Sequence, residues 1–324
     1  MARLTTILVL LTLLALPGCA KQLARRMVDA PNGGRIEAVE AGKDQLRLLG
    51  VDRQIIVPVG PPGAKISAWI LEPKGTARGT VLVLHGVFTD RTFMFGIARD
   101  LQSAGYRAVL VDLRGHGDST GNRITYGVVE AKDLVQLTDD LQLQGLVGEH
   151  LGVYGISYGA AVAIQYAAAD KRVSAVVAVA PFATLRNEVP RWARTMIPIF
   201  GWMLSDKDYA DIVDEAGKRG HFDPDQASPL QAITKTRASV LLVHGDWDWV
   251  IPMGDSQRIH AASPENSRLI VLHGLGHSGA WFDLGGAVKR DAMQWFGEHL
   301  PTDPPAIPAD RHAAHPAVLP LPAM

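Results

Sequence analysis

This sequence of 324 residues has one cysteine and a net charge close to zero. Its single cysteine, Cys19, excludes an internal disulfide and any metal cluster held by several thiolates. The 32 basic residues stand against 33 acidic ones, so the net charge is −1. Because a nucleic-acid interface needs a concentration of positive charge, we expect no nucleic-acid partner.

The apolar run near the N-terminus is too short to span a bilayer. It covers residues 7–16, whereas a spanning helix needs about 20 apolar residues. One basic residue precedes the run and the sequence Pro-Gly-Cys follows it. This pattern predicts a signal peptide over residues 1–18.

Residues 16–19, Leu-Pro-Gly-Cys, resemble the lipobox of bacterial lipoproteins, in which cleavage precedes a cysteine whose sulfur is lipidated. The resemblance implies lipidation of Cys19 and attachment to a membrane of the bacterial cell envelope. In a Gram-negative host, Ala20 after the cysteine implies the periplasmic side of the outer membrane. A secreted or periplasmic protein without an anchor is the alternative.

The rest of the chain alternates between predicted strands and helices. With 47% hydrophobic residues it can bury a large core, and its length suits one α/β domain. Continuous apolar runs predict buried parallel strands at residues 80–84, 107–111, 151–155, 172–180, 239–243 and 268–272. An antiparallel pair is predicted at residues 53–59 and 64–71, and helices at residues 91–104, 128–144, 255–262 and 286–300. This order predicts a doubly wound α/β sheet.

Three segments interrupt this alternation. Residues 19–50 are mostly polar and predict a tether that leads into the edge of a domain at residues 51–300. Residues 182–232 contain no predicted strand, which indicates an insertion with a function of its own. Residues 301–324 are too rich in proline to pack and are predicted to be a disordered tail.

Gly155-Ile156-Ser157-Tyr158-Gly159 fits the pattern G-x-S-x-G, in which a strand turns sharply into a helix with a serine at the apex. Such a turn leaves no room for side chains at the two glycines. The small apolar residues 160–169 predict a helix packed on the sheet, with its positive dipole end at the serine. A chance match is the alternative for the pentapeptide alone; its context favours a nucleophilic Ser157.

A serine nucleophile needs a base that is itself oriented by a third group. His277 stands on a glycine-containing loop after the last predicted strand, and Asp246 and Asp248 follow the strand before it. The order serine, aspartate, histidine is that of the α/β-hydrolase arrangement. Asp246 is the alternative acid, and His273 is the alternative base, although it would end its strand and face the wrong way.

These motifs resemble the α/β-hydrolase superfamily, in its bacterial serine esterase and prolyl-oligopeptidase-like branches. The resemblance spans about residues 54–300. Its HG-x-x-D-x-x-[VI]-P segment, residues 244–252, places the acid at Asp248, and its G-x-G-H segment places the base at His277. Its D-x-R-G-H-G-x-S and HG-x segments match residues 112–119 and 85–87.

The resemblance implies an α/β-hydrolase fold: a mostly parallel eight-stranded sheet flanked by helices, with a helical lid at about residues 182–232 after strand 6. It also implies that the backbone N–H groups of Tyr158 and Val87 bind the oxyanion, with Phe88 as the alternative to Val87. No cofactor and no metal is implied. His85, His116 and His244 are predicted to bond loop backbone, and Asp112 and Asp118 to stabilise turns.

The predicted lid contains apolar side chains for which three roles are open: lining an acyl pocket, packing the lid's own core, or contacting lipid. They are Trp192, Met196, Ile197, Pro198, Ile199, Phe200, Trp202, Met203 and Leu204. It also contains five carboxylates that are candidates for holding a substrate amine. They are Asp206, Asp208, Asp211, Asp214 and Glu215.

The function expected from these residues is a serine hydrolase that cleaves small-molecule carboxylic esters. Ser157, His277 and Asp248 would act through an acyl-enzyme intermediate. A peptidase of aminopeptidase type or a thioesterase would use the same three residues. A catalytically idle scaffold tethered at the envelope is the alternative from a different class.

Overall fold

The computed structural model describes residues 21–148, 150–282 and 286–301. Cys19, the signal peptide and residues 302–324 lie outside these ranges, so the lipidation and the disordered tail stay predictions. Within the described ranges, no helix has both the length and the apolar content to cross a bilayer.

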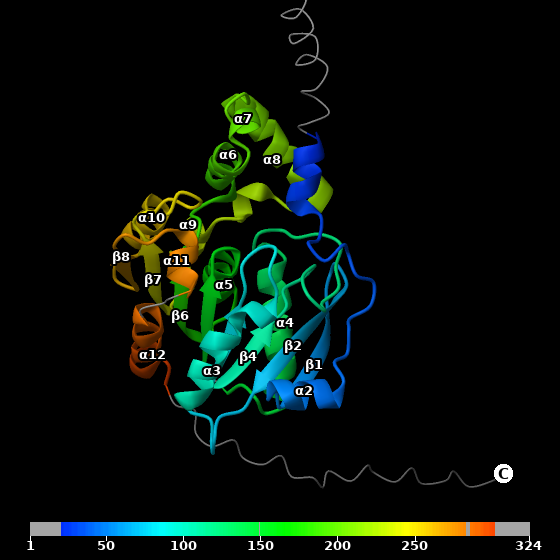
Figure 1. The fold of residues 1–324 in the computed structure, drawn as a ribbon, viewed down its shortest axis with the longest axis vertical. Coiled ribbons are helices and arrows are strands. Elements are labelled where there is room, and N and C mark those ends of the chain that lie inside the picture. Colours follow the sequence, from blue (N-terminus) through cyan, green and yellow to red (C-terminus); the bar gives the residue numbers. More distant parts are fainter. Residues whose placement is uncertain (1–20, 149, 283–285, 302–324) are drawn as a thin grey trace, which may run out of the picture.

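An eight-stranded, mostly parallel sheet forms the centre of the molecule, as the resemblance implied (Figure 1). Its order is β1-β2-β4-β3-β5-β6-β7-β8, and only the pairs β1·β2 and β2·β4 are antiparallel. The strands are β1 Arg53–Val59, β2 Ala64–Leu71, β3 Thr80–Leu84, β4 Arg107–Val111, β5 Leu151–Ile156, β6 Val173–Val179, β7 Ser239–Gly245 and β8 Ser267–Leu272. The carboxyl ends of the parallel strands therefore share one edge of the sheet.

Helices cover both faces of the sheet. On one face pack α4 (Glu130–Leu143), α5 (Tyr158–Ala169) and α10 (Gly254–Ala262). On the other pack η1 (Arg91–Met94), α3 (Phe95–Ser103), α11 (His277–Phe282) and α12 (Ala287–His299). Alternate residues of one strand serve the two cores, since Leu82 packs in the first and Val83 in the second. A strand buried on both faces is uniformly apolar for this reason.

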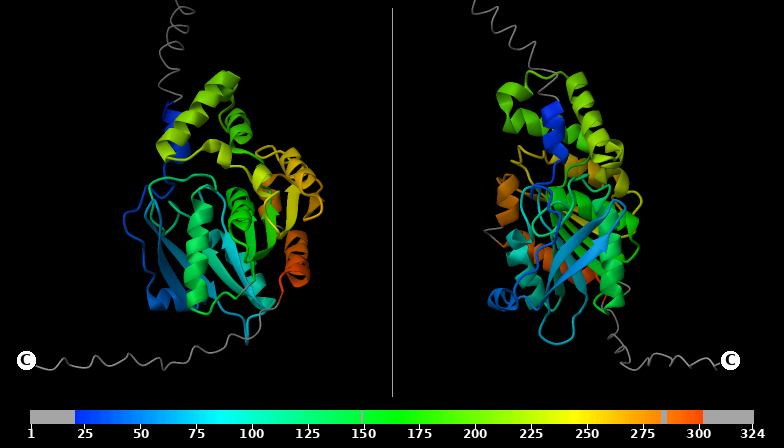
Figure 2. Two further views of the ribbon diagram at one scale, coloured as in Figure 1. Left: turned by 180° about the vertical axis from the view of Figure 1, so that it is seen from behind. Right: turned by 90° about the vertical axis from the view of Figure 1, so that its right-hand side faces the viewer.

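Between β6 and β7 the chain forms a group of helices with a separate core. They are α6 (Leu185–Met196), α7 (Pro198–Gly201), α8 (Asp206–Gly220), η2 (Pro224–Gln226) and α9 (Pro229–Ala232). We call α6, α7 and α8 the inserted helices. They stand beyond the carboxyl edge of the sheet, over α5 (Figures 1 and 2). Their core includes Leu185, Val189, Tyr209 and Ile212.

The segment before β1 carries helices that the sequence did not predict. Residues 21–28 are helical, and α2 spans Lys43–Leu49. Ala24 and Val28 are fully buried in the core of the inserted helices, and the first helix lies beside α8 (Figures 1 and 2). With Leu23 and Met27, which pack against the same core, they form an apolar stripe only two turns long, which is easily missed in a polar segment.

Candidate active site

The G-x-S-x-G segment forms the predicted turn from strand to helix. β5 ends at Ile156, Ser157 follows with φ 52° and ψ −118°, and α5 begins at Tyr158. A positive φ is costly for a residue other than glycine and is kept only where the surroundings impose it. Here the N–H of Ser157 donates to the carbonyl of Val179, 2.7 Å away, which ties the turn to β6.

Both glycines of this segment are required by close backbone contacts. A Cβ atom on Gly155 would lie 2.4 Å from the carbonyl oxygen of Gly159. A Cβ atom on Gly159 would lie 2.4 Å from the carbonyl oxygen of His85. In each case the obstacle is backbone, which cannot move aside as a flexible side chain can. The turn therefore depends on glycine at both positions.

The structure brings together the three side chains that the sequence singled out. Oγ of Ser157 lies 3.1 Å from Nε2 of His277, and Nδ1 of that imidazole lies 2.5 Å from Oδ2 of Asp248. They come from the start of α5, the start of α11 and the loop after β7. All three are buried, with exposed fractions of 5%, 9% and 6% for the serine, histidine and aspartate.

The carboxylate of Asp248 is held on both of its oxygens. Oδ1 accepts hydrogen bonds from the N–H groups of Val250 (3.0 Å) and Ile251 (2.8 Å), and Nε2 of His244 lies 3.3 Å from Oδ2. Burial by itself raises the pKa of Asp248, but its contacts with His244 and His277 outweigh burial and hold the pKa below its usual value. The side chain is therefore an anion beside the imidazole at neutral pH.

The alternative acid and base pair with each other, away from the serine. Nδ1 of His273 lies 2.8 Å from Oδ2 of Asp246, and the N–H of Gly274 donates to Oδ1 at 2.7 Å. The side chain of His273 is 85% exposed. This pair ties the loop after β8 to the loop after β7.

The loop after β3 lies next to the serine. A Cβ atom on Gly86 would be 3.7 Å from Cβ of Ser157. The next residue is Val87, which is half-buried, and Phe88 follows with φ 61° and an exposed side chain. Tyr158 is the first residue of α5, and its backbone N–H has no acceptor within the helix, as is general at a helix N-terminus. Val87 thus follows a residue that lies against Ser157, and Tyr158 follows Ser157 itself.

Three other histidines near this edge bond to loop backbone, as the sequence predicted. Nε2 of His85 accepts from the N–H of Leu113, and Nδ1 of His116 lies 2.9 Å from the carbonyl oxygen of Arg114. Nε2 of His244 lies 2.8 Å from the carbonyl oxygen of Ile251. Burial lowers the pKa of His85 to about 4 and that of His116 to about 3, so both are neutral at pH 7.

The segment at residues 112–119 is a buried polar network rather than a second set of reacting groups. Asp112 forms an ion pair with Arg91 and accepts from the N–H groups of Arg91 and Asp118. Arg91 also pairs with Asp118, and its guanidinium lies 4.0 Å from the centre of the Trp69 ring. These contacts hold the loop after β4 against η1, consistent with the predicted structural roles of the two aspartates.

Glu188, a buried carboxyl group in α6, was not predicted from the sequence. Glu188 is 8% exposed, and its Oε2 has no hydrogen-bond partner. Burial, together with the charges of Asp255 and Asp248, holds its pKa well above the usual value, against an opposing effect of Arg191. The five carboxylates noted in the sequence lie instead on α8, where each has a partner within the inserted segment. A glutamate in an amphipathic helix gives no local sign that it will be buried.

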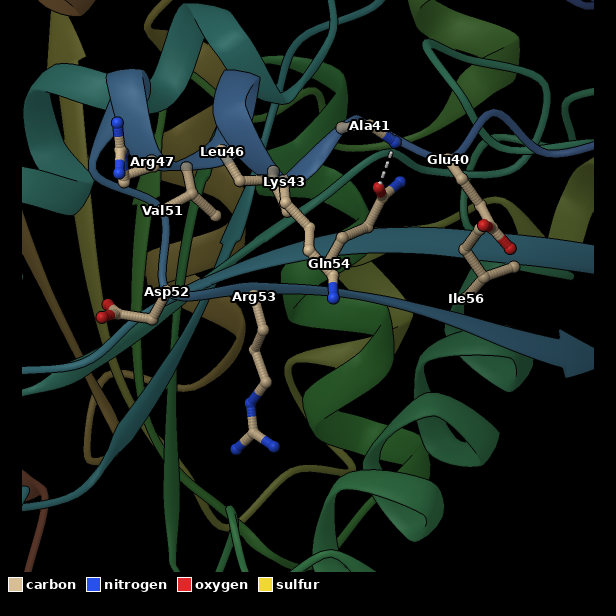
Figure 3. Close-up of a pocket in the computed structure, with 10 residues that line it drawn as sticks. All are labelled: Glu40, Ala41, Lys43, Leu46, Arg47, Val51, Asp52, Arg53, Gln54 and Ile56. Atoms are coloured by element: carbon tan, nitrogen blue, oxygen red, sulfur yellow. Dashed lines mark hydrogen bonds between the residues drawn. The ribbon is translucent and has the colours of Figure 1, made fainter.

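A surface pocket lies away from the three side chains. It measures about 770 Å³ and lies between α2 and the edge strand β1 (Figure 3). Its cationic side chains do not converge, because Arg47 and Arg53 point in different directions, while Gln54 bonds the N–H of Ala41 at 2.7 Å. Over the described residues, no group of three or more histidine, cysteine, aspartate or glutamate side chains is arranged to hold a metal ion.

A buried serine at a strand-to-helix turn, hydrogen-bonded to a histidine that contacts an aspartate, at the carboxyl edge of this sheet, defines the α/β-hydrolase arrangement. Residues 75–232 match the family described as serine aminopeptidase, S33 (Hydrolase_4). The chain has the α/β-hydrolase fold, and this family match, together with the relatives below, supports the α/β-hydrolase superfamily and a serine hydrolase.

Individual relatives are distant and cover most of the chain. An uncharacterised protein of Mycobacterium tuberculosis is 26% identical over 274 residues, covering 84% of this chain and 86% of that protein. A monoacylglycerol lipase of Mycolicibacterium smegmatis is 26% identical, covering 74% of this chain and 96% of the lipase. Among solved structures, an esterase of Pyrococcus furiosus superposes with a TM-score of 0.65 at 20% identity, covering 82% of this chain and 98% of the esterase.

Proposed function

We propose that the protein is a serine hydrolase that cleaves carboxylic esters through an acyl-enzyme. The observation that carries the proposal is the hydrogen-bonded series from Oγ of Ser157 through the imidazole of His277 to Asp248. A serine hydroxyl is a weak nucleophile, and an adjacent base that is oriented by a carboxylate makes it reactive. The named relatives that are a lipase and an esterase agree with an ester as the substrate.

In the proposed first step, Oγ of Ser157 attacks the ester carbonyl carbon while Nε2 of His277 takes the hydroxyl proton. The imidazolium then gives this proton to the departing alcohol, which leaves an acyl group on the serine. Water attacks the acyl group, again with His277 as base, and the acid product is released. Asp248 orients the imidazole and stabilises its positive form throughout.

The negative charge that forms on the carbonyl oxygen needs donors that are already in place. We assign this role to the backbone N–H groups of Tyr158 and Val87, because both flank Ser157 and neither side chain takes part. Loss of one such donor typically costs about 10²–10³ in rate. The assignment requires no cofactor.

The position of the inserted helices fits a lid. They stand over the carboxyl edge of the sheet, and Oγ1 of Thr195 in α6 lies 3.2 Å from the carbonyl oxygen of Trp249, next to Asp248. Ser157 is only 5% exposed beneath them. We propose that movement of α6, whose C-terminal end contacts the loop of Asp248, admits substrate. We further propose that Cys19 is lipidated and anchors the protein in the cell envelope.

Covalent labelling tests the proposed nucleophile. A fluorophosphonate should label the wild-type chain and leave the Ser157→Ala variant unlabelled. Hydrolysis of p-nitrophenyl esters of graded chain length should fall about 10⁴-fold or more in the same variant, with an unchanged thermal unfolding midpoint. Absence of labelling in the wild-type protein would favour the idle scaffold, and ester hydrolysis by the variant would refute the assignment of Ser157.

Glu188 favours one second candidate, an aminopeptidase. A buried carboxyl without a hydrogen-bond partner on one oxygen can accept a substrate ammonium group, and the matching family is described as serine aminopeptidase. In that case aminoacyl anilides should be cleaved faster than esters without an amine. Glu188→Gln should then raise KM for the anilides alone, whereas an equal effect on both substrate types would reject amine binding.

A further inference from the structure

Exposed apolar side chains gather around α7 at the outer end of the inserted helices. Ile199 is 87% exposed and Trp202 72%, and Met196 and Met203 are each 53% exposed. We call these four residues the α7 tip. The guanidinium of Arg194 lies 5.3 Å from the centre of the Trp202 ring and steadies it in this outward position. Large side chains exposed together in this way mark a surface that meets an apolar partner.

The α7 tip is not needed for the core of the inserted helices. That core is filled from the other side of the same segment, where Ile197, Phe200 and Leu204 pack inward. The sequence left three roles open for these apolar residues, and the structure separates them into two sets. The inward set packs the core, and each residue of the outward set is more than half exposed.

Two exposed tryptophans lie on the loop that carries Asp248. Beside the C-terminal end of α6, where Thr195 contacts the Trp249 backbone, the side chain of Trp249 is 76% exposed. Trp247 is also exposed, and its backbone N–H donates to the carbonyl of Leu275, two residues before His277. This loop thus contacts both the end of α6 and the segment that carries the proposed base.

The N-terminal helix indicates what covers this surface. Residues 21–28 pack in the same core as α6 and α8, at the end of the molecule where α7 lies (Figures 1 and 2). Cys19, the proposed lipid anchor, stands two residues before this helix in the chain. The helix itself exposes Lys21, Arg25 and Arg26, cations that anionic lipid headgroups attract. This basic helix and the α7 tip lie at the same end of the molecule (Figures 1 and 2).

We propose that the α7 tip docks on a lipid bilayer, with Ile199, Trp202 and Met203 inserted among the headgroups and upper acyl chains. Side chains of this kind bind the interfacial region, where tryptophan is especially favoured. The Trp247 and Trp249 loop then lies along the path from the bilayer to Ser157. The substrate class that follows, an ester with a long acyl chain drawn from the membrane, rests on the proposed ester hydrolysis.

Quenching of tryptophan fluorescence tests the docking directly. The full chain is bound to vesicles of phosphatidylglycerol and phosphatidylcholine whose acyl chains carry bromine, which quenches only tryptophans within the bilayer. Because a lipidated Cys19 can hold the protein on vesicles by itself, the readout must be local. Trp202→Phe should remove a large part of the quenchable emission, and Trp295→Phe, which alters a buried side chain in α12, should remove none. Equal quenching in wild type and Trp202→Phe would overturn the proposal.

Hydrolysis of a long-chain ester carried in the vesicles tests the consequence. Ile199→Asn combined with Met203→Gln should lower this rate roughly tenfold or more, because two apolar contacts with the bilayer are lost. Hydrolysis of a soluble short-chain ester should not change. Leu143→Asn is the matched control, since Leu143 is 88% exposed on α4, away from α7, and should change neither rate.

The proposed ester hydrolysis and the proposed membrane docking can be refuted separately. If no ester is cleaved but Trp202 is quenched, the proposed function fails and the docking stands. If esters are cleaved but the paired α7 substitutions leave the vesicle rate unchanged, the docking fails. If sedimentation instead shows a dimer that Ile199→Asn dissociates, a second copy covers the α7 tip and the bilayer is excluded as its partner.

Discussion

Nδ1 of His277 lies 2.5 Å from Oδ2 of Asp248, although 29 residues separate the two in the chain. The second oxygen of the carboxylate is held by the N–H groups of Val250 and Ile251. The loop that carries Asp248 therefore orients its carboxylate independently of the imidazole. A hydrogen bond from Nδ1 to this carboxylate leaves Nε2 free of a proton and able to accept one from Ser157.

Asp248→Asn should lower kcat about 10⁴-fold with little change in KM. If the asparagine amide donates to Nδ1 of His277, the imidazole carries its own proton on Nε2. In that tautomer it cannot accept the serine proton. Initial rates on a p-nitrophenyl ester measure the effect. Asp246→Asn, which removes the exposed contact with His273, is the control and should stay near the wild-type rate. Comparable losses in the two variants would exclude Asp248 as the acid.

Gly159→Ala should destabilise the fold by about 1–3 kcal/mol or more. Its Cβ atom would meet the carbonyl oxygens of His85 and Leu84 at 2.4 and 2.6 Å. Urea unfolding measures the loss. Gly96→Ala is the matched control, because that glycine lies in α3 with open space around it, and alanine there should add up to about 1 kcal/mol. A neutral effect of Gly159→Ala would mean that the turn differs from the one described.

Glu188→Gln should make stability less dependent on pH. Because the pKa of Glu188 is raised by burial and by Asp255, the native state holds the proton more tightly than the unfolded chain. The stabilisation from this proton is complete below about pH 4, near the unfolded pKa, and is lost as pH rises toward the native pKa. Glutamine stays neutral, so the stability of the variant relative to wild type should increase as pH rises above the unfolded pKa and through the neutral range.

Unfolding midpoints in urea, measured across this pH range, test the prediction for Glu188. Glu215→Gln is the control, because Glu215 is partly exposed and paired with Arg219 on α8. That variant should keep the pH dependence of the wild type. Parallel curves for wild type and Glu188→Gln would show that the carboxyl of Glu188 is not buried in its neutral form.

Tyr126→Phe should loosen the N-terminal helix. The hydroxyl of Tyr126 donates to the carbonyl of Met27 at 2.7 Å, so its loss should cost about 1 kcal/mol of docking energy. Hydrogen exchange of residues 21–29 should become faster. Tyr209→Phe, which removes a comparable bond to the carbonyl of Gly201, should leave that exchange unchanged. Unchanged exchange in Tyr126→Phe would show that the apolar contacts of Ala24 and Val28 hold the helix without this bond.

Much of the sheet was predictable because its signal is local. The strands β1 to β4 have the predicted bounds, and β5 leads into the predicted turn at Ser157. A strand covered on both faces is uniformly apolar, and a turn with no room for side chains needs glycine. The three side chains that meet at the site were also identified, because each follows a predicted strand and parallel strands end at one edge.

The N-terminal segment and Glu188 were not predictable for the opposite reason. Residues 23, 24, 27 and 28 form an apolar stripe only two turns long, and their burial depends on α6 and α8 more than 150 residues away. By its sequence context, Glu188 is indistinguishable from a surface glutamate, and only the packing of α6 buries it. A short local pattern does not indicate which distant surface will cover it.

By itself, the sequence determined the α/β alternation, the turn at Ser157 and the identity of the residues that meet there, since backbone sterics and apolar periodicity act over a few neighbouring residues. Only the tertiary structure decided which apolar residues of the inserted helices face inward and which form the α7 tip. It also placed the N-terminal helix beside them. Those choices depend on which surfaces meet after distant segments have packed, and burial free energy is set at that point.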